Sequence, residues 1–313
     1  MKHATFDPGF TQKYTGSIRR IINENGEFNV RRRGANWHDI HPYLYMINIT
    51  WPRFLVNVFA GYLVLNFIFA GIYWFAGVEH LRGAEAPTAI GRFFNAFFFS
   101  AHTLTTVGYG SIAPEGVLAN SIAALEALCG LMSFALATGL LFGRFSKPAA
   151  RLGFSRHMLV APFGDGLSLQ FRVANRRSNN LMELEAKLLL ATVEPGDGQM
   201  KRKYANLTLE RPSVLFLPLT WTVVHPLDET SPLYGKTPDD LAAIQAEFLV
   251  LLKAFDDTFY QIVHTRHSYR YDEVVWHAQF EPAFSIDADG DVLLEMERVS
   301  KYRALKPVED GHQ

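Results

Sequence analysis

The stretch Thr106-Val107-Gly108-Tyr109-Gly110 lies between two long apolar segments and directly follows an aromatic-rich run. Its glycines allow backbone conformations with positive φ, and carbonyl groups that all point toward one axis need alternating backbone conformations. Carbonyl oxygens from four such loops, with the Thr106 hydroxyl at the inner end, can replace the hydration shell of a potassium ion. A glycine-rich turn is the alternative, but the flanking segments are those that a pore needs. The sequence therefore predicts a potassium selectivity filter at residues 106–110.

The composition divides the chain into a membrane part and a soluble part. The chain has 313 residues, of which 49% are hydrophobic, and its formal net charge is −1. Residues 51–145 are mostly apolar, whereas the remainder has the composition of an ordinary soluble domain. The small net charge and the lack of a basic, aromatic-interleaved patch argue against binding of nucleic acid. The lone cysteine, Cys129, excludes a disulfide within one chain, and the polar N-terminus predicts no cleavable signal peptide.

Two segments are long and apolar enough to cross a bilayer. Residues 54–76 carry no charged side chain, and residues 117–143 carry one, Glu126. Each segment exceeds the ~20 residues that a membrane span requires. Residues 92–105 are apolar and aromatic but too short to span, so we expect a re-entrant pore helix. The negative end of its dipole would point toward the pore, where it favours a cation.

Basic residues lie on the same side of both expected spans. Arg31 to Arg33 and Arg53 precede the first span, and Arg144, Lys147 and Arg151 follow the second. The tendency of basic residues to remain inside the cell places both termini in the cytoplasm. The pore helix and filter would then open toward the outside.

The chain before the first span divides into two segments. Residues 1–36 are polar and are expected to form a cytoplasmic N-terminal segment that is extended or partly disordered. In residues 37–50, Ile40, Leu44 and Ile47 recur at helical spacing, which predicts an amphipathic slide helix in the membrane interface. A soluble surface helix has the same pattern. The two-span pore domain would then occupy residues 51–150.

Residues 151–313 have the pattern of a β-rich domain. Short apolar or alternating runs are separated by turn signals such as Asp289-Gly290, which predicts a β-sandwich. One short helix is expected at residues 238–246, with Thr237 as its N-cap. The acidic run 287–291 is partly similar to a calcium loop, but it lacks the full ligand spacing and is more typical of a hairpin turn.

The order of these parts resembles that of the inward-rectifier potassium channel family, specifically its bacterial members. Three further motifs carry the resemblance: GRFSKP at residues 143–148, HPLDETSPL at 225–233 and AFDDT at 254–258. Thr105 and the filter also match the signature of potassium channels. The resemblance implies two transmembrane helices and a pore helix per subunit, with an all-β immunoglobulin-like sandwich as the cytoplasmic domain. It also implies a homotetramer in the bacterial inner membrane that conducts potassium as permeant ion, without a cofactor.

The resemblance assigns roles to residues of the second span. Phe142 matches the bundle-crossing aromatic, where four apolar rings can close a pore, although packing against lipid is the alternative. Phe134, Thr138 and Phe142 are four residues apart and share one helix face, which would line the inner cavity. Gly130 matches the hinge glycine of the family, but close helix packing would equally require glycine.

Some positions depart from the family pattern. Strong rectifiers carry an acidic residue where this chain has Phe134, so we expect weak block by magnesium or polyamines. His102 and Ser111 stand where acidic residues usually support the filter loop, and both can still donate or accept hydrogen bonds. His102 could titrate near neutral pH or could be an ordinary buried histidine. Glu126 is expected to support the filter by bonding His102, or else to remain protonated in a packed interface.

Arg144, Lys147 and Arg151 match in position the basic cluster with which the family contacts anionic phosphoinositide headgroups. They could also serve only as markers of membrane topology. Eukaryotic members have two further lysines where this chain has Ala149 and Ala150.

The sequence contains no pairing of a nucleophile with a base, so no enzyme is expected. Glu183 and Glu185 alternate along an expected strand and would either line a cytoplasmic vestibule or form a solvated face. The competing function is a non-conducting, membrane-anchored receptor or scaffold with a ligand-binding β-sandwich. The filter sequence argues against that function. The prediction is passive, potassium-selective conduction of the inward-rectifier type, gated by the second span and modulated by the cytoplasmic domain and anionic lipid.

Overall fold

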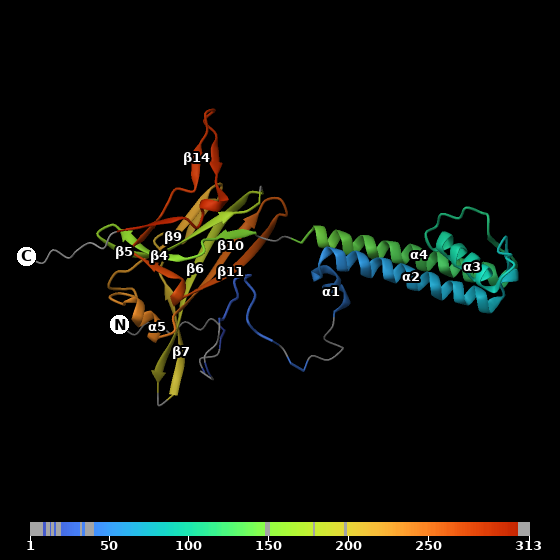
Figure 1. Cartoon of the computed structure of the whole chain (residues 1–313), viewed down its shortest axis with the longest axis horizontal. Coiled ribbons are helices and arrows are strands. Elements are labelled where there is room, and N and C mark those ends of the chain that lie inside the picture. The colour runs from blue at the N-terminus through green and yellow to red at the C-terminus, as the bar shows by residue number, and fades with distance from the viewer. Residues whose placement is uncertain are drawn as a thin grey trace, which may run out of the picture. The chain divides into compact units, whose positions relative to one another are not determined.

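The computed structural model describes residues 9–10, 13, 16, 20–31, 33–34, 41–147, 151–177, 179–196 and 199–305. The chain forms two units (Figure 1). Residues 32–147 form a helical unit, and residues 1–31 together with 148–313 form a β-rich unit. Each unit has its own core and is described by itself.

The helical unit contains both expected spans. Its elements are α1 (Pro42–Asn48), α2 (Trp51–Ala76), the 3-10 helix η2 (Val78–His80), α3 (Ala89–Leu104) and α4 (Gly116–Phe145). Helix α2 has 26 residues with a mean hydropathy of 2.0, and α4 has 30 residues with a mean hydropathy of 1.8. Both are longer than the ~20 residues that cross a bilayer, which confirms the prediction of two transmembrane helices.

Helix α3 is the expected pore helix. Its 16 residues rise about 24 Å, less than the ~30 Å of a hydrocarbon core. The helix begins where the Thr88 hydroxyl accepts the N–H of Gly91 at 3.1 Å, an N-cap that satisfies one of the free amides. It ends at Leu104, directly before the filter loop.

The segments on either side of α3 and the filter are joined by two short strands. Strand β1 (Leu81–Arg82) pairs antiparallel with β2 (Ala113–Pro114). Gly83 follows β1 with φ +83°, and a Cβ at this position would lie 2.2 Å from the carbonyl oxygen of Ser111. The close approach allows only glycine, and it fixes the segment that follows the filter against the segment that precedes α3.

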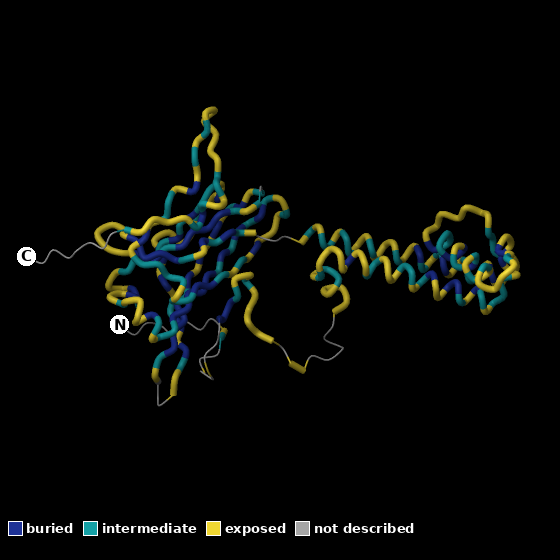
Figure 2. Tube along the Cα trace, viewed as in Figure 1, coloured by how far each residue is buried: buried dark blue, intermediate teal, exposed yellow. Residues whose placement is uncertain are grey.

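The core of the helical unit lies where α2, α3 and α4 meet, and the rest of both long helices is mostly exposed or half-buried in the single chain (Figure 2). Buried Phe69 and Tyr73 of α2 pack with Ala96 and Phe99 of α3. In the most apolar window of α4, only 11% of residues are buried within this chain. Such extensive apolar surface needs lipid or other protein to cover it.

Helix α1 is shorter than the predicted slide helix. It begins at Pro42, which fits the first turn because proline lacks the N–H that this turn leaves unbonded. Residues 37–40 of the expected helix lie outside the described residues. Leu44, one of the residues that suggested the amphipathic face, is exposed in the single chain.

Two five-stranded sheets form the β-rich unit. The first has the order β11-β10-β6-β7, with β8 also paired to β6, and the second has the order β12-β4-β5-β3, with β9 also paired to β5. The strands are β3 (Leu152–Phe154), β4 (Met158–Phe163), β5 (Gly166–Asn175), β6 (Leu181–Gly196), β7 (Gln199–Leu207), β8 (Ser213–Phe216), β9 (Thr220–Pro226), β10 (Glu247–Asp256), β11 (Gln261–Arg270) and β12 (Val274–Trp276).

One hydrophobic core joins the two sheets. Phe248, Val250 and Leu252 alternate along β10 and share this core with Leu169 and Phe171 of β5. Burial of every second residue is the pattern of strands that face a sandwich interior. The structure thus confirms the predicted all-β sandwich.

Smaller elements complete the β-rich unit. They are α5 (Pro238–Ala243), η3 (Tyr271–Glu273), β13 (Ala278–Phe280), β14 (Phe284–Ile286), β15 (Val292–Leu294), η4 (Met296–Arg298) and β16 (Tyr302–Ala304). Helix α5 begins at the predicted cap Thr237 but ends three residues earlier than expected. Strands β14 and β15 pair antiparallel around Gly290, which has φ +89°, so the acidic run is a hairpin turn as predicted.

Residues 20–31 run along the β-rich unit and are packed against it. Ile21 and Ile22 are buried with Tyr204 and Leu249, and the Glu247 carboxylate accepts the N–H of Ile21 at 2.9 and 3.0 Å. Arg20 bonds Glu273 at 2.6 Å. This part of the N-terminal segment is therefore ordered by the domain and is not a free tail.

Candidate functional site

The predicted filter loop, residues 106–110, has positive φ at every second residue. Thr106, Gly108 and Gly110 have φ of +58°, +55° and +79°, whereas Val107 and Tyr109 lie outside the positive region. For Thr106 this conformation is strained, because an L-residue with a branched side chain rarely adopts it. The N–H groups of Val107 and Gly108 donate to the carbonyl of His102 at 3.0 and 3.2 Å. The pore helix thus holds the first half of the loop directly.

The side chains of the loop are left uncovered by their own subunit. Val107 is 53% exposed and Tyr109 is 74% exposed. The His102 ring meets the Tyr109 ring edge-on, with 4.8 Å between centroids and 89° between planes. The Thr105 hydroxyl donates to the carbonyl of Ala101 at 2.7 Å and so closes the end of α3. The structure therefore brings His102 and Thr105 to the filter, in agreement with their predicted location.

Glu126 lies behind the pore helix, but it does not bond His102 as expected. Its carboxylate is fully buried and accepts the Tyr73 hydroxyl at 2.7 Å and the Ser100 hydroxyl. Ser100 Oγ is also 3.2 Å from Oδ1 of Asn66, which is fully buried. The side of α3 that carries Ser100 faces α4, and this leaves His102 directed elsewhere.

Sequence reasoning missed Tyr73, Ser100 and Asn66. Asn66 and Tyr73 are seven residues apart in an otherwise apolar span, a separation of about two helical turns that places them on one face. Polar side chains on one face of a membrane helix indicate contact with another polar group, and Glu126 was the available partner.

Gly130 is a site of close packing between α4 and the pore helix. A Cβ at Gly130 would lie 2.0 Å from the carbonyl oxygen of Leu104, the last residue of α3. No side chain fits in that space. The contact supports the packing interpretation of Gly130, and its role as a hinge stays a prediction.

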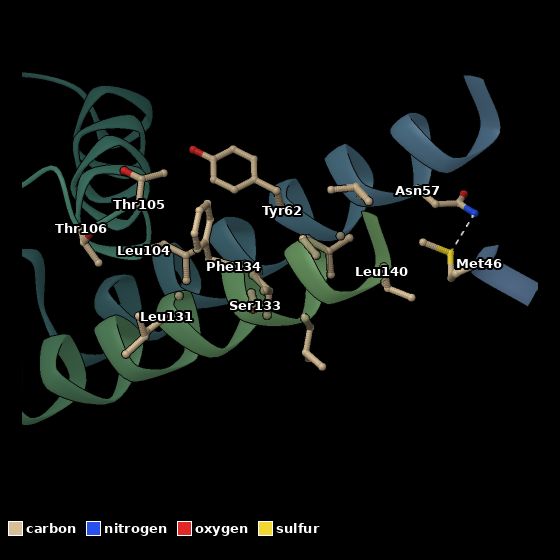
Figure 3. A pocket seen from close by; sticks show the side chains of 17 residues that line it. Met46, Asn57, Tyr62, Leu104, Thr105, Thr106, Leu131, Ser133, Phe134 and Leu140 are labelled. Atoms are coloured by element: carbon tan, nitrogen blue, oxygen red, sulfur yellow. Dashed lines mark hydrogen bonds between the residues drawn. The ribbon is translucent and has the colours of Figure 1, made fainter. Parts of the chain in front are cut away.

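An open, mostly apolar cavity of about 870 Å³ lies between α2, α4 and the end of α3 (Figure 3). Thr105 and Thr106 line one end, Phe134 lies in the middle part, and Met46 lies toward the other end. Phe134 is 74% exposed and Phe142 is 72% exposed in the single chain, and Thr138 between them is also exposed. The face of α4 that was predicted to line a cavity is thus uncovered within one subunit.

Arg144 engages the end of α1. Its guanidinium donates to the carbonyls of Met46 at 2.6 Å, Ile47 at 3.0 Å and Ile49 at 2.8 Å. It also stacks on Trp51, with 4.5 Å from the guanidinium carbon to the ring centroid.

Lys147, two residues after the end of α4, donates to Oδ1 of Asn48. The structure brings Arg144 and Lys147 together at α1, whereas Arg151 belongs to the β-rich unit.

The two motifs of the soluble domain build turns. His225 is buried and contacts Thr208 O at 2.6 Å and Ser231 Oγ at 2.8 Å through its two ring nitrogens. Burial lowers the pKa of His225, so the ring is neutral near pH 7. Asp256 is buried and accepts Nδ2 of Asn179 at 2.9 Å and the N–H of Thr258 at 3.0 Å. These residues stabilise the fold.

The helical unit has the parts of a pore-forming subunit: two membrane-length helices, a short helix between them and a filter loop. These parts define the class of two-span ion channel subunits. In agreement, the protein family described as "Ion channel" matches residues 61–147, and the family described as "Inward rectifier potassium channel C-terminal domain" matches residues 152–309.

Similar proteins identify the family. The inward rectifier potassium channel Kirbac3.1 of Paramagnetospirillum magnetotacticum is 38% identical over 283 residues, which cover 88% of this chain and 93% of that protein. The G protein-activated inward rectifier potassium channel 3 of Mus musculus is 26% identical, with 91% of this chain and 78% of that protein covered. The Caenorhabditis elegans channel irk-1 is 27% identical over 83% of this chain and 52% of that protein, about half its length. This chain belongs to the inward rectifier potassium channel family.

Proposed function

We propose that four copies of this chain surround one axis and conduct potassium passively through residues 106–110. The observation that carries this proposal is the alternation of positive φ at Thr106, Gly108 and Gly110. Such alternation turns successive carbonyls toward one side, and one loop alone cannot encircle an ion. The exposure of Val107 and Tyr109 supports assembly, because neighbouring copies would cover them.

The second span would act as the gate. Four Phe142 rings at the inner mouth can close a pore by steric block and dewetting, and Phe134 and Thr138 would line the cavity above them. Because Phe134 provides no negative charge, we expect weak block by magnesium and polyamines. Gly130 would then be the hinge of α4, with the part of the helix before it held against the pore helix and the part toward Phe142 free to move.

The membrane setting follows from the two spans and the basic residues that flank them. We place the channel in a bacterial inner membrane with both termini in the cytoplasm. The β-rich unit would modulate the gate, and anionic headgroups would bind near Lys147 and Arg151. Arg144 is the weakest of the three lipid candidates, because its guanidinium already bonds three carbonyls.

Flux from purified protein in liposomes tests the proposal. Vesicles loaded with potassium should take up a potassium tracer, exclude sodium and be blocked by barium, whereas Gly108→Ala should abolish uptake because its φ of +55° suits glycine. A membrane-anchored receptor or scaffold predicts vesicles that stay closed to both ions. Equal passage of sodium and potassium would also contradict the proposal.

A further inference from the structure

The pore helix is fastened to α4 at two positions, one helical turn apart on each helix. Glu126 of α4 bonds Ser100 of α3, and Gly130 of α4 abuts the carbonyl of Leu104 of α3. Residues four apart lie on the same face of a helix, so the two contacts form one continuous line. The contact between Glu126 and Ser100 is polar, and the contact between Gly130 and Leu104 is steric.

The polar contact reaches a third helix. Tyr73 of α2 donates to Glu126 Oε2 at 2.7 Å, and Asn66 of α2 lies 3.2 Å from Ser100 Oγ. Tyr73 is 1% exposed, and Asn66, Ser100 and Glu126 are fully buried. A polar group in a membrane interior is costly unless it is bonded, so these four side chains favour one arrangement of the three helices.

A short path connects this cluster to the filter. Ser100 is two residues before His102, whose carbonyl accepts the N–H groups of Val107 and Gly108. A shift of α3 relative to α4 would therefore move the backbone acceptor that holds the filter loop. Filter geometry controls selectivity, because the carbonyl oxygens must match a dehydrated ion.

We propose that Tyr73 and Ser100 are positioning residues of the filter, which act through the Glu126 carboxylate to hold the pore helix at its working distance from α4. The inference rests on the proposed conduction through residues 106–110 and adds a specific mechanical support from α2. The inference assigns the support to the hydroxyl groups of Tyr73 and Ser100. Removal of either hydroxyl should therefore change ion selectivity, while the ring of Tyr73 and helix α3 stay packed.

The test compares Tyr73→Phe and Ser100→Ala with wild type as assembled protein in liposomes. Loss of one hydrogen bond of about 1 kcal/mol corresponds to about a fivefold change, so the potassium-to-sodium flux ratio should fall by about fivefold in each variant. Ser100→Thr keeps the hydroxyl and should restore most of the ratio. Ser121→Ala is the matched control, because its hydroxyl bonds Val117 of its own helix at 2.8 Å and bonds no second helix among the residues that the structure describes.

A second readout separates this inference from the proposed function. Thermal unfolding of the purified assembly is measured in potassium and in sodium, and the difference between the two midpoints reports ion binding in the filter. The difference should shrink in Tyr73→Phe and Ser100→Ala but persist in Ser121→Ala. The inference would be overturned if both variants kept the flux ratio of wild type and the wild-type difference between the two midpoints. The proposed function would be refuted if the wild-type protein itself passed no potassium. Glu126→Gln, which keeps volume and polarity, replaces any variant that fails to assemble.

Discussion

Gly130 is a residue at which α4 packs directly against the pore helix, and we predict that Gly130→Ala damages the channel. An added methyl group would lie 2.0 Å from the Leu104 carbonyl, so the pore helix must move. Overpacking of this kind costs about 1–3 kcal/mol, and here it would also displace the start of the filter. Thermal unfolding and potassium flux of the reconstituted variant would measure both effects.

Gly71→Ala is the control for that substitution. Gly71 lies inside helix α2, and a Cβ there would meet no atom within 4 Å in the single chain. Alanine is favoured over glycine in a helix by about 1 kcal/mol, so this variant should be at least as stable as wild type. If Gly130→Ala conducts like wild type, the close-packing account of this residue is incorrect.

Phe134 is the residue that sets the charge of the proposed cavity. We predict that Phe134→Asp makes outward potassium flux sensitive to spermine on the cytoplasmic side, because carboxylates in a low-dielectric cavity attract cations strongly. Phe134→Asn supplies a polar side chain of similar size to Asp without the charge, and it should stay insensitive. Equal spermine block of both variants would show that charge at this position does not control block.

At the scale of elements, one guanidinium makes three hydrogen bonds between α4 and the end of α1. Arg144 bonds three carbonyls at the end of α1, and it lies two residues after the proposed gate residue Phe142. The planar fork of Arg can reach several acceptors at once, whereas Lys is a point charge that binds phosphate well. Arg144→Lys therefore separates a role in joining helices from a role in lipid binding.

We predict that Arg144→Lys lowers the thermal stability of the assembled channel about as much as Arg144→Gln does, by about 1–3 kcal/mol. Binding to vesicles that contain anionic lipid should fall only in the Gln variant, because Lys keeps the positive charge. Lys147→Arg serves as the conservative control at the neighbouring basic residue. If Arg144→Lys matches wild type in stability and flux, the headgroup role would be favoured instead.

Strand β11 gives the β-rich unit a defined response to acid. Burial, with a further contribution from the charge of Arg20, lowers the pKa of His267 to about 4, and its ring stacks on Phe154 at 4.6 Å. The ordinary pKa of histidine is about 6.5, so between these values the unfolded chain binds a proton that the folded chain does not. Stability should therefore decline as pH falls from about 6.5 toward 4, by on the order of 3 kcal/mol from this residue.

His267→Phe should flatten that decline, because it keeps an aromatic ring on Phe154 and removes the titrating group. Unfolding by denaturant at pH 7.5 and 4.5 would measure the difference in stability for wild type and variant. His264→Gln, at an exposed position of the same strand, should leave the wild-type decline unchanged. An equal decline in His267→Phe would assign the acid sensitivity to other groups.

The elements could be predicted from the sequence because their signals are local. Length and hydropathy indicate α2 and α4, and alternation indicates strands such as β10. The contacts that build the site could not be predicted, since they join distant positions: Tyr73 and Glu126 are 53 residues apart, and Arg144 and Met46 are 98 residues apart. Glu126 was recognised as important. Its partners depend on which faces of α2 and α3 meet, and the local pattern of the sequence does not show which faces these are.

At the scale of the whole molecule, the single chain is incomplete as a pore. Its filter side chains, its cavity face and most of the surface of α4 are exposed, and these surfaces are mostly apolar. A cyclic arrangement covers such surfaces by repeating one contact around an axis. In the proposed ring of four, each subunit would contribute one quarter of the filter, and a defect in any copy would affect the entire pore.

We therefore predict a steep effect when wild-type chains are mixed with Gly108→Ala chains before assembly. With equal amounts and random association into rings of four, only about one sixteenth of the assemblies contain four wild-type filter loops. Potassium flux should fall to about that fraction of the flux from wild-type protein, whereas two-subunit pores would keep about a quarter and independent subunits about half. Mixing the two proteins after assembly is the control and should keep about half of the flux. A flux near one half in the co-assembled sample would mean that the loops conduct separately, which the geometry of a single loop does not permit.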